Sequence, residues 1–154
     1  MVRAKISSKV SVICRVWFFQ MLIAAGGTPF TLLAAERQNV NFDDILELPY
    51  RISDYKVNYG AESLQFGRLW LPIDKKNGTV IFIHGGCWMN EYKIDHAYAF
   101  ATELASAGYA VWSLEYRRIG DLGGGWPGTF EDVISGINKL KDLGEFDLDM
   151  EKLV

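Results

Sequence analysis

The sequence predicts an α/β fold in which an antiparallel hairpin precedes a parallel β-α-β-α-β unit. Polar and apolar residues alternate over 55–59 and again over 64–71, and a turn at 60–63 separates them, which predicts the hairpin. The apolar run at 79–83 has no such alternation, which is typical of a strand buried on both faces of a parallel sheet. From there strand and helix patterns follow each other to the end of the chain.

The first predicted helix covers residues 96–106, with Asp95 as its N-cap and Ala107-Gly108 at its end. A second apolar strand is predicted over 109–116. A helix between two strands of one sheet forms a right-handed crossover, so the strands before and after it are expected to be parallel.

The second predicted helix follows a glycine-rich loop at 120–128 and has Thr129 as its N-cap. Its core-facing stripe is predicted to consist of Val133, Ile137 and Leu140. Leu153-Val154 has the character of a third apolar strand at its beginning.

The first 35 residues differ from the rest of the chain, since they hold four basic residues and no acidic one. An apolar run over 16–25 leads into Gly26-Gly27, which together predict a secretory signal peptide cleaved after Gly26 or Ala35. The expected location is therefore periplasmic or secreted. The alternative is an uncleaved membrane anchor over 16–35, in which case the protein would be membrane-tethered.

Three segments follow from this division: a signal or anchor at 1–35, an acidic linker or short amphipathic turn at 36–49, and a folded domain at 50–154. Without the first segment the formal charge is 12 minus 19, or −7, which argues against nucleic-acid binding.

The cysteine and histidine content limits the possible cofactors. Cys14 lies in the signal segment, so Cys87 would remain unpaired, and no disulfide framework is expected. His84 and His96 are the only histidines, and no metal-ligand spacing surrounds them. No metal and no cofactor are predicted.

The motif that suggests chemistry is His84-Gly85-Gly86-Cys87-Trp88, directly after the apolar strand. Consecutive glycines allow the backbone to turn sharply and bring its N–H groups close to another group. Amides directed into a pocket stabilise the oxyanion that forms during acyl transfer. The alternative is a tight turn without chemistry.

Together with other segments, this motif resembles the N-terminal part of an α/β-hydrolase of the esterase and lipase branch, which includes feruloyl-esterase-like and arylformamidase-like proteins. The resemblance covers residues 59–154 and rests on Tyr59-Gly60, Leu69-Trp70-Leu71-Pro72, His84-Gly85-Gly86-Cys87-Trp88, Gly108-Tyr109-Ala110-Val111, Glu115-Tyr116-Arg117-Arg118, Trp126-Pro127 and Asp132.

The resemblance implies a role for each residue of the loop. Gly86 and Cys87 would donate their backbone N–H groups to the oxyanion, Trp88 would wall the acyl pocket, and His84 and Gly85 would support the loop. Cys87 stands where the family usually has glycine, so it is expected to keep a negative φ. The cluster at 115–118 is interpreted as an ion-pair network that holds the loop. Trp112, Trp126 and Phe130 are expected in the core, with a place in the pocket wall as the alternative.

The family's nucleophile is a serine in a G-x-S-x-G elbow, followed by an acid and a histidine, and the sequence contains no such motif. We therefore expect the chain to stop before the elbow, to lack esterase activity, and to leave the strand at 80–83 as an aggregation-prone edge. In a longer form the partner would be a small ester or amide. The alternatives are an arylformamidase-type amide hydrolase, a non-catalytic binding module, and an enzyme using Cys87 as nucleophile. The oligomeric state is not predicted.

Overall fold

The computed structural model of the chain describes residues 40–74 and 77–154. These residues belong to one compact unit, Asn39–Val154. The predicted signal peptide and the start of the linker lie outside the described residues. No helix in the described part of the chain is long and apolar enough to cross a membrane.

The described residues form a mixed four-stranded sheet with the strand order β1-β2-β4-β3. The pairs β1–β2 and β2–β4 are antiparallel, and β3–β4 is parallel. This confirms the predicted hairpin and the parallel β-α-β unit that follows it. The strands are β1 (Tyr55–Asn58), β2 (Phe66–Trp70), β3 (Gly78–Ile83) and β4 (Tyr109–Leu114).

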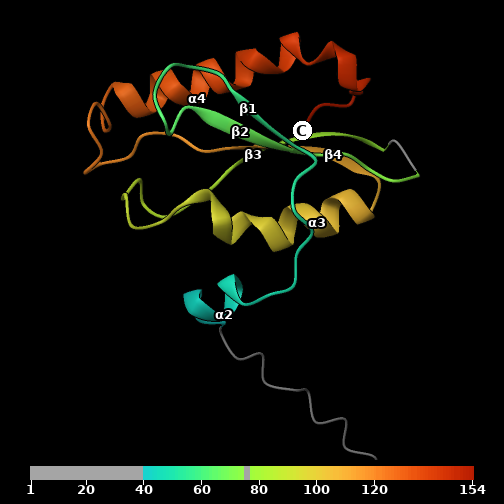
Figure 1. The fold of residues 1–154 in the computed structure, drawn as a ribbon, viewed down its shortest axis with the longest axis horizontal. Coiled ribbons are helices and arrows are strands. Elements are labelled where there is room, and N and C mark those ends of the chain that lie inside the picture. Colours follow the sequence, from blue (N-terminus) through green and yellow to red (C-terminus); the bar gives the residue numbers. More distant parts are fainter. Residues whose placement is uncertain (1–39, 75–76) are drawn as a thin grey trace, which may run out of the picture. The chain divides into compact units, whose positions relative to one another are not determined.

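Helices cover both faces of this sheet, with α3 on one side and α4 on the other (Figure 1). A short helix, α2, precedes the sheet within the segment assigned to the linker. The helices are α2 (Phe42–Leu46), α3 (Tyr98–Ser106) and α4 (Gly128–Lys139), with the 3-10 turns η1 (Ile94–Ala97), η2 (Leu140–Asp142) and η3 (Gly144–Phe146).

Strand β4 separates the two halves of the core because its successive side chains point to opposite faces. On the α4 side, Trp112 and Leu114 pack in a fully buried cluster with Leu69, Leu140 and Leu143. On the α3 side, Val111 packs with Trp70, Ala101 and Ala105. The sheet is thus held between two apolar layers.

Strand β3 is less buried than its sequence predicts. Its side chains at 80–82 are half-buried, and Ile83 is 38% exposed. The reason is its position at the end of the strand order. Only its first residues gain a neighbour on the open side: Leu153 forms a parallel bridge with Thr79, and the Ile81 N–H donates to the Val154 carbonyl over 2.8 Å. At the strand expected over 153–154, the described residues show this isolated bridge and not a further strand of the sheet.

The start of the first predicted helix differs from expectation. Asp95 is not an N-cap but lies inside η1, and its carboxylate accepts the N–H of His96, the next residue, over 3.0 Å. The α-helix begins only at Tyr98. Its end agrees with the prediction, since Ala107 is the C-cap and Gly108 has φ +94°.

The second helix also differs in its start and its buried face. It begins at Gly128, so Thr129 is not the cap; its hydroxyl instead accepts the Gly125 N–H over 3.0 Å. Ile137 is 36% exposed, whereas Gly136 is buried. A Cβ at Gly136 would stand 2.7 Å from a methyl of Leu114, so the absence of a side chain lets α4 approach the sheet there.

Candidate active site

The loop after β3 contains a tight turn. The Met89 N–H donates to the Gly86 carbonyl over 3.0 Å, and both residues between them have positive φ, +52° at Cys87 and +62° at Trp88. This is the pattern of a type I′ turn, which disfavours side chains at its centre. The expectation of a negative φ at Cys87 is therefore wrong. Each left-handed non-glycine residue costs roughly 1 kcal/mol, so the surrounding contacts must hold this conformation.

The two amides expected to bind an oxyanion have no hydrogen-bond partner among the described residues. The Gly86 and Cys87 N–H groups donate no hydrogen bond to any described residue, whereas the N–H groups of Met89 and Asn90 are both engaged. Gly86 has φ +119°, and a Cβ on it would stand 2.3 Å from the Cβ of Tyr92. Only glycine fits this position without displacement of its neighbours.

Beneath the loop lies a buried carboxylate, Glu115, which is 2% exposed. Its Oε1 is 3.0 Å from Nε2 of His84 and accepts the Tyr116 N–H, while its Oε2 accepts the Ile94 N–H over 3.1 Å. The Arg118 guanidinium lies 3.4 Å from Oε1. Burial opposes the ionisation of Glu115, but the hydrogen bonds from His84 and from the Ile94 amide outweigh it and hold its pKa below the ordinary value.

His84 connects this carboxylate to the loop. Its Nδ1 lies 2.9 Å from the Gly85 carbonyl oxygen, and its ring stacks on Tyr116 with 4.4 Å between centroids. The Tyr116 hydroxyl donates to the His84 carbonyl. Burial, and secondarily the Glu115 charge, raises the pKa of Tyr116 to about 12, so this donor stays protonated. Both ring nitrogens of His84 are engaged, which argues against a role as general base.

A second set of contacts fastens the loop to the segment after β4. The Ile119 N–H donates to the Trp88 carbonyl over 2.8 Å, and the Asn90 N–H donates to the Ile119 carbonyl over 3.1 Å. Arg118 donates to the Tyr92 carbonyl and to Asp121. The loop is therefore held on both sides of the strained turn.

Arg117 points to α4 rather than to the loop. It makes a bidentate ion pair with the buried Asp132, with NH2–Oδ1 2.6 Å and Nε–Oδ2 2.8 Å, and Gln65 donates to the same carboxylate over 2.7 Å. Burial works against the Asp132 charge, but the bonds from Arg117 and Gln65 prevail and lower its pKa. The four residues at 115–118 thus form two separate networks, a division that the sequence pattern did not reveal.

Of the three aromatic residues expected in the core, one is buried and two lie on the surface. Trp112 is in the core, as predicted, but Trp126 is 82% exposed and Phe130 is 44% exposed, so their predicted core positions are wrong. Trp88 is 39% exposed, and its ring centroid lies 5.4 Å from that of Phe130. The Phe130 ring in turn contacts Trp126 edge-on, with 5.2 Å between the ring centroids. These three rings form an exposed aromatic wall beside Cys87.

The Cys87 thiol is exposed. Within the part of the chain that the structure describes, no hydrogen bond joins it to His84 or His96, although a thiol nucleophile needs a base within reach. The described residues also contain no group of three His, Cys, Asp or Glu side chains that could hold a metal ion.

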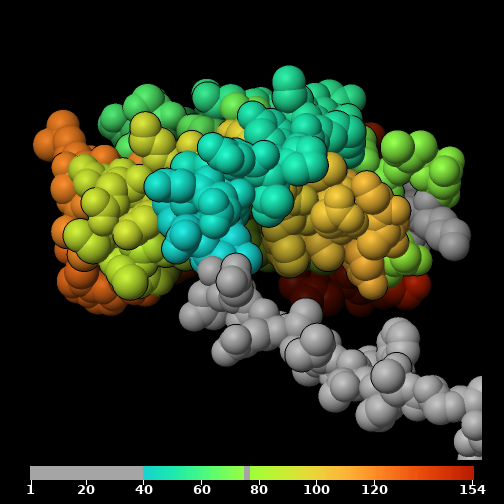
Figure 2. Space-filling model, turned by 90° about the horizontal axis from the view of Figure 1, so that it is seen from below, coloured from blue at the N-terminus to red at the C-terminus, as the bar shows by residue number. Residues whose placement is uncertain are grey.

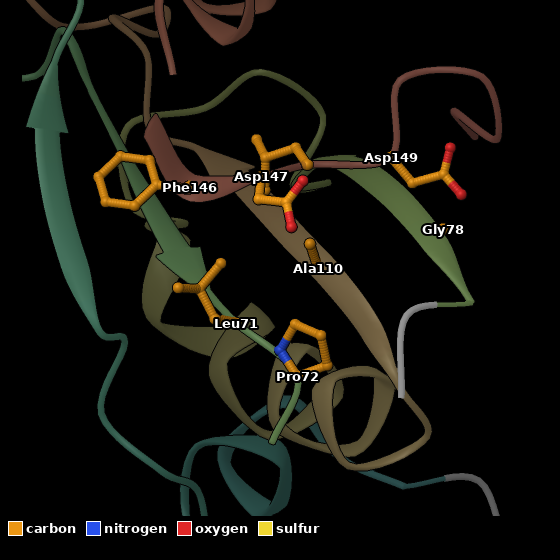
Figure 3. Close-up of a pocket in the computed structure, with 8 residues that line it drawn as sticks. Leu71, Pro72, Gly78, Ala110, Phe146, Asp147 and Asp149 are labelled. Atoms are coloured by element: carbon orange, nitrogen blue, oxygen red, sulfur yellow. The ribbon is translucent and has the colours of Figure 1, made fainter. Parts of the chain in front are cut away.

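Three cavities lie away from the loop. One, of about 100 Å³, is at the opposite end of the parallel strands and is lined by Leu71, Pro72, Gly78, Ala110 and Asp149 (Figure 3). A second is lined by residues of α2, of α3 and of the segments beside them. A third is lined by Ile73, Asp74, Asn77 and residues 105–108. None of the three is lined by residues 84–88.

Comparison with known proteins agrees with this architecture. The BD-FAE family model matches residues 69–154, and the chain belongs to this family. Its fold is that of the α/β-hydrolases, and the structures it resembles include esterases, which confirms the resemblance inferred from the sequence. A search among curated proteins found no match.

Three solved structures illustrate the likeness. An arylesterase is 18% identical with a TM-score of 0.58 over 97% of this chain and 48% of its own. Esterase B from Lactobacillus rhamnosis is 21% identical with a TM-score of 0.56, covering 94% and 42%. A truncated carbohydrate esterase from gut microbiota is 26% identical with a TM-score of 0.55, covering 68% and 38%. The chain thus spans less than half the length of each.

Proposed function

We propose that the chain supplies the oxyanion-binding portion of a carboxylic-ester hydrolase. The observation that carries this proposal is the pair of amides at Gly86 and Cys87, which donate to none of the described residues and lie on a turn held in a strained conformation by surrounding contacts. Such pre-oriented donors stabilise developing negative charge because they need no reorganisation during the reaction. In the complete site they would face the carbonyl oxygen of a small ester substrate, with Trp88 beside the acyl group.

The nucleophile of this reaction would be a serine in a G-x-S-x-G elbow, a motif that the 154 residues do not contain. Without it no acyl-enzyme forms, and the 154-residue chain should hydrolyse esters no faster than a heat-treated sample. An amide substrate of the arylformamidase kind would use the same donors. A binding module without catalysis is the remaining alternative, and it requires that no extension of the chain confer activity.

Two matched glycine substitutions test the loop in a version extended by the codons that follow Val154. Gly86→Ala places a Cβ against Tyr92, whereas Gly85 has nothing within 4 Å of an added Cβ. We expect Gly86→Ala to lower kcat for p-nitrophenyl butyrate by about 100-fold or more, and Gly85→Ala to retain activity. Equal activity of both variants would contradict the oxyanion-binding role of the loop amides. The absence of a glycine-flanked serine in the extension would contradict the proposed hydrolase function.

We also propose that the protein is exported, with residues 1–35 as a signal peptide. This proposal rests on the basic and apolar composition of that segment. Amino-terminal sequencing of the mature protein tests it: a new terminus after Gly26 or Ala35 is expected, and an intact Met1 would contradict cleavage.

A further inference from the structure

The short helix α2 contacts the rest of the protein through few side chains. None of its five residues is fully buried, and within residues 40–50 only Phe42 and Ile45 are half-buried. After the helix, the Tyr50 ring meets Tyr98 of α3 edge-on at 5.3 Å between centroids. Figure 2 shows the α2 segment, in cyan, lying against the yellow-green part of the chain that follows β3.

Phe42 contacts two aromatic side chains in the connection between β3 and α3. Its ring centroid lies 5.0 Å from that of Tyr92, with the rings at 84°, and 5.5 Å from that of His96, with the rings at 61°. Edge-to-face arrangements of this kind are favourable for aromatic rings. One side chain thus joins α2 to this connection at two points.

Both of these rings touch the glycine loop on their other side. Tyr92 packs directly on Gly86, since a Cβ added to the glycine would stand 2.3 Å from the Cβ of Tyr92. The His96 ring meets His84 edge-on at 5.3 Å between centroids, and Nδ1 of His84 lies 2.9 Å from the Gly85 carbonyl oxygen. Two contacts therefore lead from α2 to the residues beside the candidate oxyanion amides.

The turn in this loop needs support from outside. Cys87 and Trp88 both have positive φ, and non-glycine residues keep such a conformation only where the surrounding structure holds it. Hydrogen bonds with Ile119 hold the Trp88 side of the turn. On the Gly86 side the neighbour is the Tyr92 side chain, and α2 supplies a ring that packs against it.

We propose that α2 braces the glycine loop and that Phe42 is the positioning residue of this brace. Its ring holds Tyr92 against Gly86. It also holds His96 against His84. The consequence for ester hydrolysis rests on the proposed function, because only then are the braced amides oxyanion donors, but the brace itself does not depend on it.

Phe42→Ala in the 154-residue chain tests the brace by NMR. The core should remain intact, because neither buried apolar cluster includes Phe42. We expect the backbone order parameters of Gly86 and Cys87 to fall from about 0.85 to about 0.6 or lower. Hydrogen exchange of the Met89 N–H, which closes the turn on the Gly86 carbonyl, should become about tenfold faster or more, while exchange of the β4 amides stays unchanged.

Two further variants separate the ring contact from a general effect on α2. Leu46→Ala shortens an apolar side chain of the same helix that is 40% exposed, and it should leave the loop unchanged. Phe42→Tyr keeps the ring and should retain the order parameters of the original protein. Unchanged loop dynamics in Phe42→Ala, equal changes in Leu46→Ala, or faster exchange throughout β4 would overturn the brace. Loss of order in Phe42→Tyr equal to that in Phe42→Ala would overturn the role of the ring.

The result is independent of the test of the hydrolase. Equal activity of Gly86→Ala and Gly85→Ala would remove the oxyanion donors and leave the brace in place. Unchanged loop dynamics in Phe42→Ala would remove the brace and leave the donors.

Discussion

His84 and Glu115 are 31 positions apart in the sequence, yet Nε2 of one lies 3.0 Å from Oε1 of the other in the interior of the protein. The first residue follows β3 and the second follows β4, so the parallel pairing of these strands brings both to the same edge of the sheet. Through this contact the second strand supports the loop that follows the first.

Loss of the Glu115 carboxylate should destabilise the protein strongly, because Nε2 of His84 and the Ile94 and Tyr116 amides would lose their buried acceptor. For Glu115→Ala we expect the free energy of unfolding to fall by about 3–5 kcal/mol, and for Glu115→Gln by less, since the amide oxygen still accepts. Urea denaturation followed by tryptophan fluorescence measures the change. Glu151→Ala, at an exposed turn, is the control, and an equal effect of both substitutions would contradict the network.

A glycine in place of Cys87 should stabilise the loop. The residue has φ +52°, which glycine adopts without the steric cost of a Cβ. We expect Cys87→Gly to raise the free energy of unfolding by about 1 kcal/mol, and Cys87→Ala to change it little. Thermal melting of the three proteins measures the difference. In an active extended form, both variants should retain activity; inactivation of Cys87→Ala would restore the thiol as a candidate nucleophile.

The close approach of α4 to the sheet depends on Gly136. A Cβ added there meets Leu114 at 2.7 Å, and Trp112 donates its indole N–H to the Gly136 carbonyl over 2.9 Å. Gly136→Ala should therefore lower the free energy of unfolding by about 1–3 kcal/mol despite the better helix propensity of alanine. Gly144→Ala, with open space around the added methyl, is the matched control in chemical denaturation. A stabilising effect at Gly136 would show that α4 can shift away at little cost.

Stability should decrease on acidification through Glu115 and Asp132. Their pKa values are lowered in the folded state, so the folded protein binds fewer protons than the unfolded chain. Their contribution to the free energy of unfolding is complete above the ordinary pKa values, 4.5 for Glu115 and 3.8 for Asp132. It is lost as the pH falls through their lower folded-state pKa values. Urea midpoints measured between pH 7 and pH 3 should show this decrease, and Asp132→Asn should make it shallower. If the urea midpoint of that variant depended on pH as steeply as in the original protein, Asp132 would not contribute to the acid sensitivity.

The partly unpaired side of β3 should promote self-association. Ile83, at the end of this strand, is 38% exposed, and an apolar strand edge pairs readily with other chains. We expect Ile83→Lys to slow the growth of light scattering on mild heating. Ile73→Lys, at an 81% exposed position before β3, adds the same charge outside the strand and is the control. Equal suppression by both lysines would indicate a general charge effect rather than edge pairing.

The sequence predicted much of the fold because hydrophobic periodicity reports which faces are buried. The alternation around β1 and β2 and the apolar runs of β3 and β4 gave the strands in their places. Helix starts were predicted less well. Asp95 and Thr129 have the side chains of caps, but tertiary contacts use them differently: the Thr129 hydroxyl binds the loop before α4 and the carbonyl of Arg117.

The candidate site was only partly visible in the sequence. The glycine loop was recognised because two glycines follow a buried strand, whereas the left-handed conformation of Cys87 and Trp88 carries no local signal. Likewise, neighbouring positions 115–118 did not indicate which arginine serves the loop and which serves α4, because that depends on the elements packed against each side chain.

By itself, the sequence determined the class of fold and the location of the glycine loop, because strand burial and backbone flexibility are properties of short segments. Only the tertiary structure decided that the amides of Gly86 and Cys87 find no partner in the described part of the chain, that Glu115 is buried beneath them, and that α4 faces the sheet through Gly136. These features arise where segments distant in the chain compete for the same hydrogen bonds and the same volume, and local patterns do not record that competition.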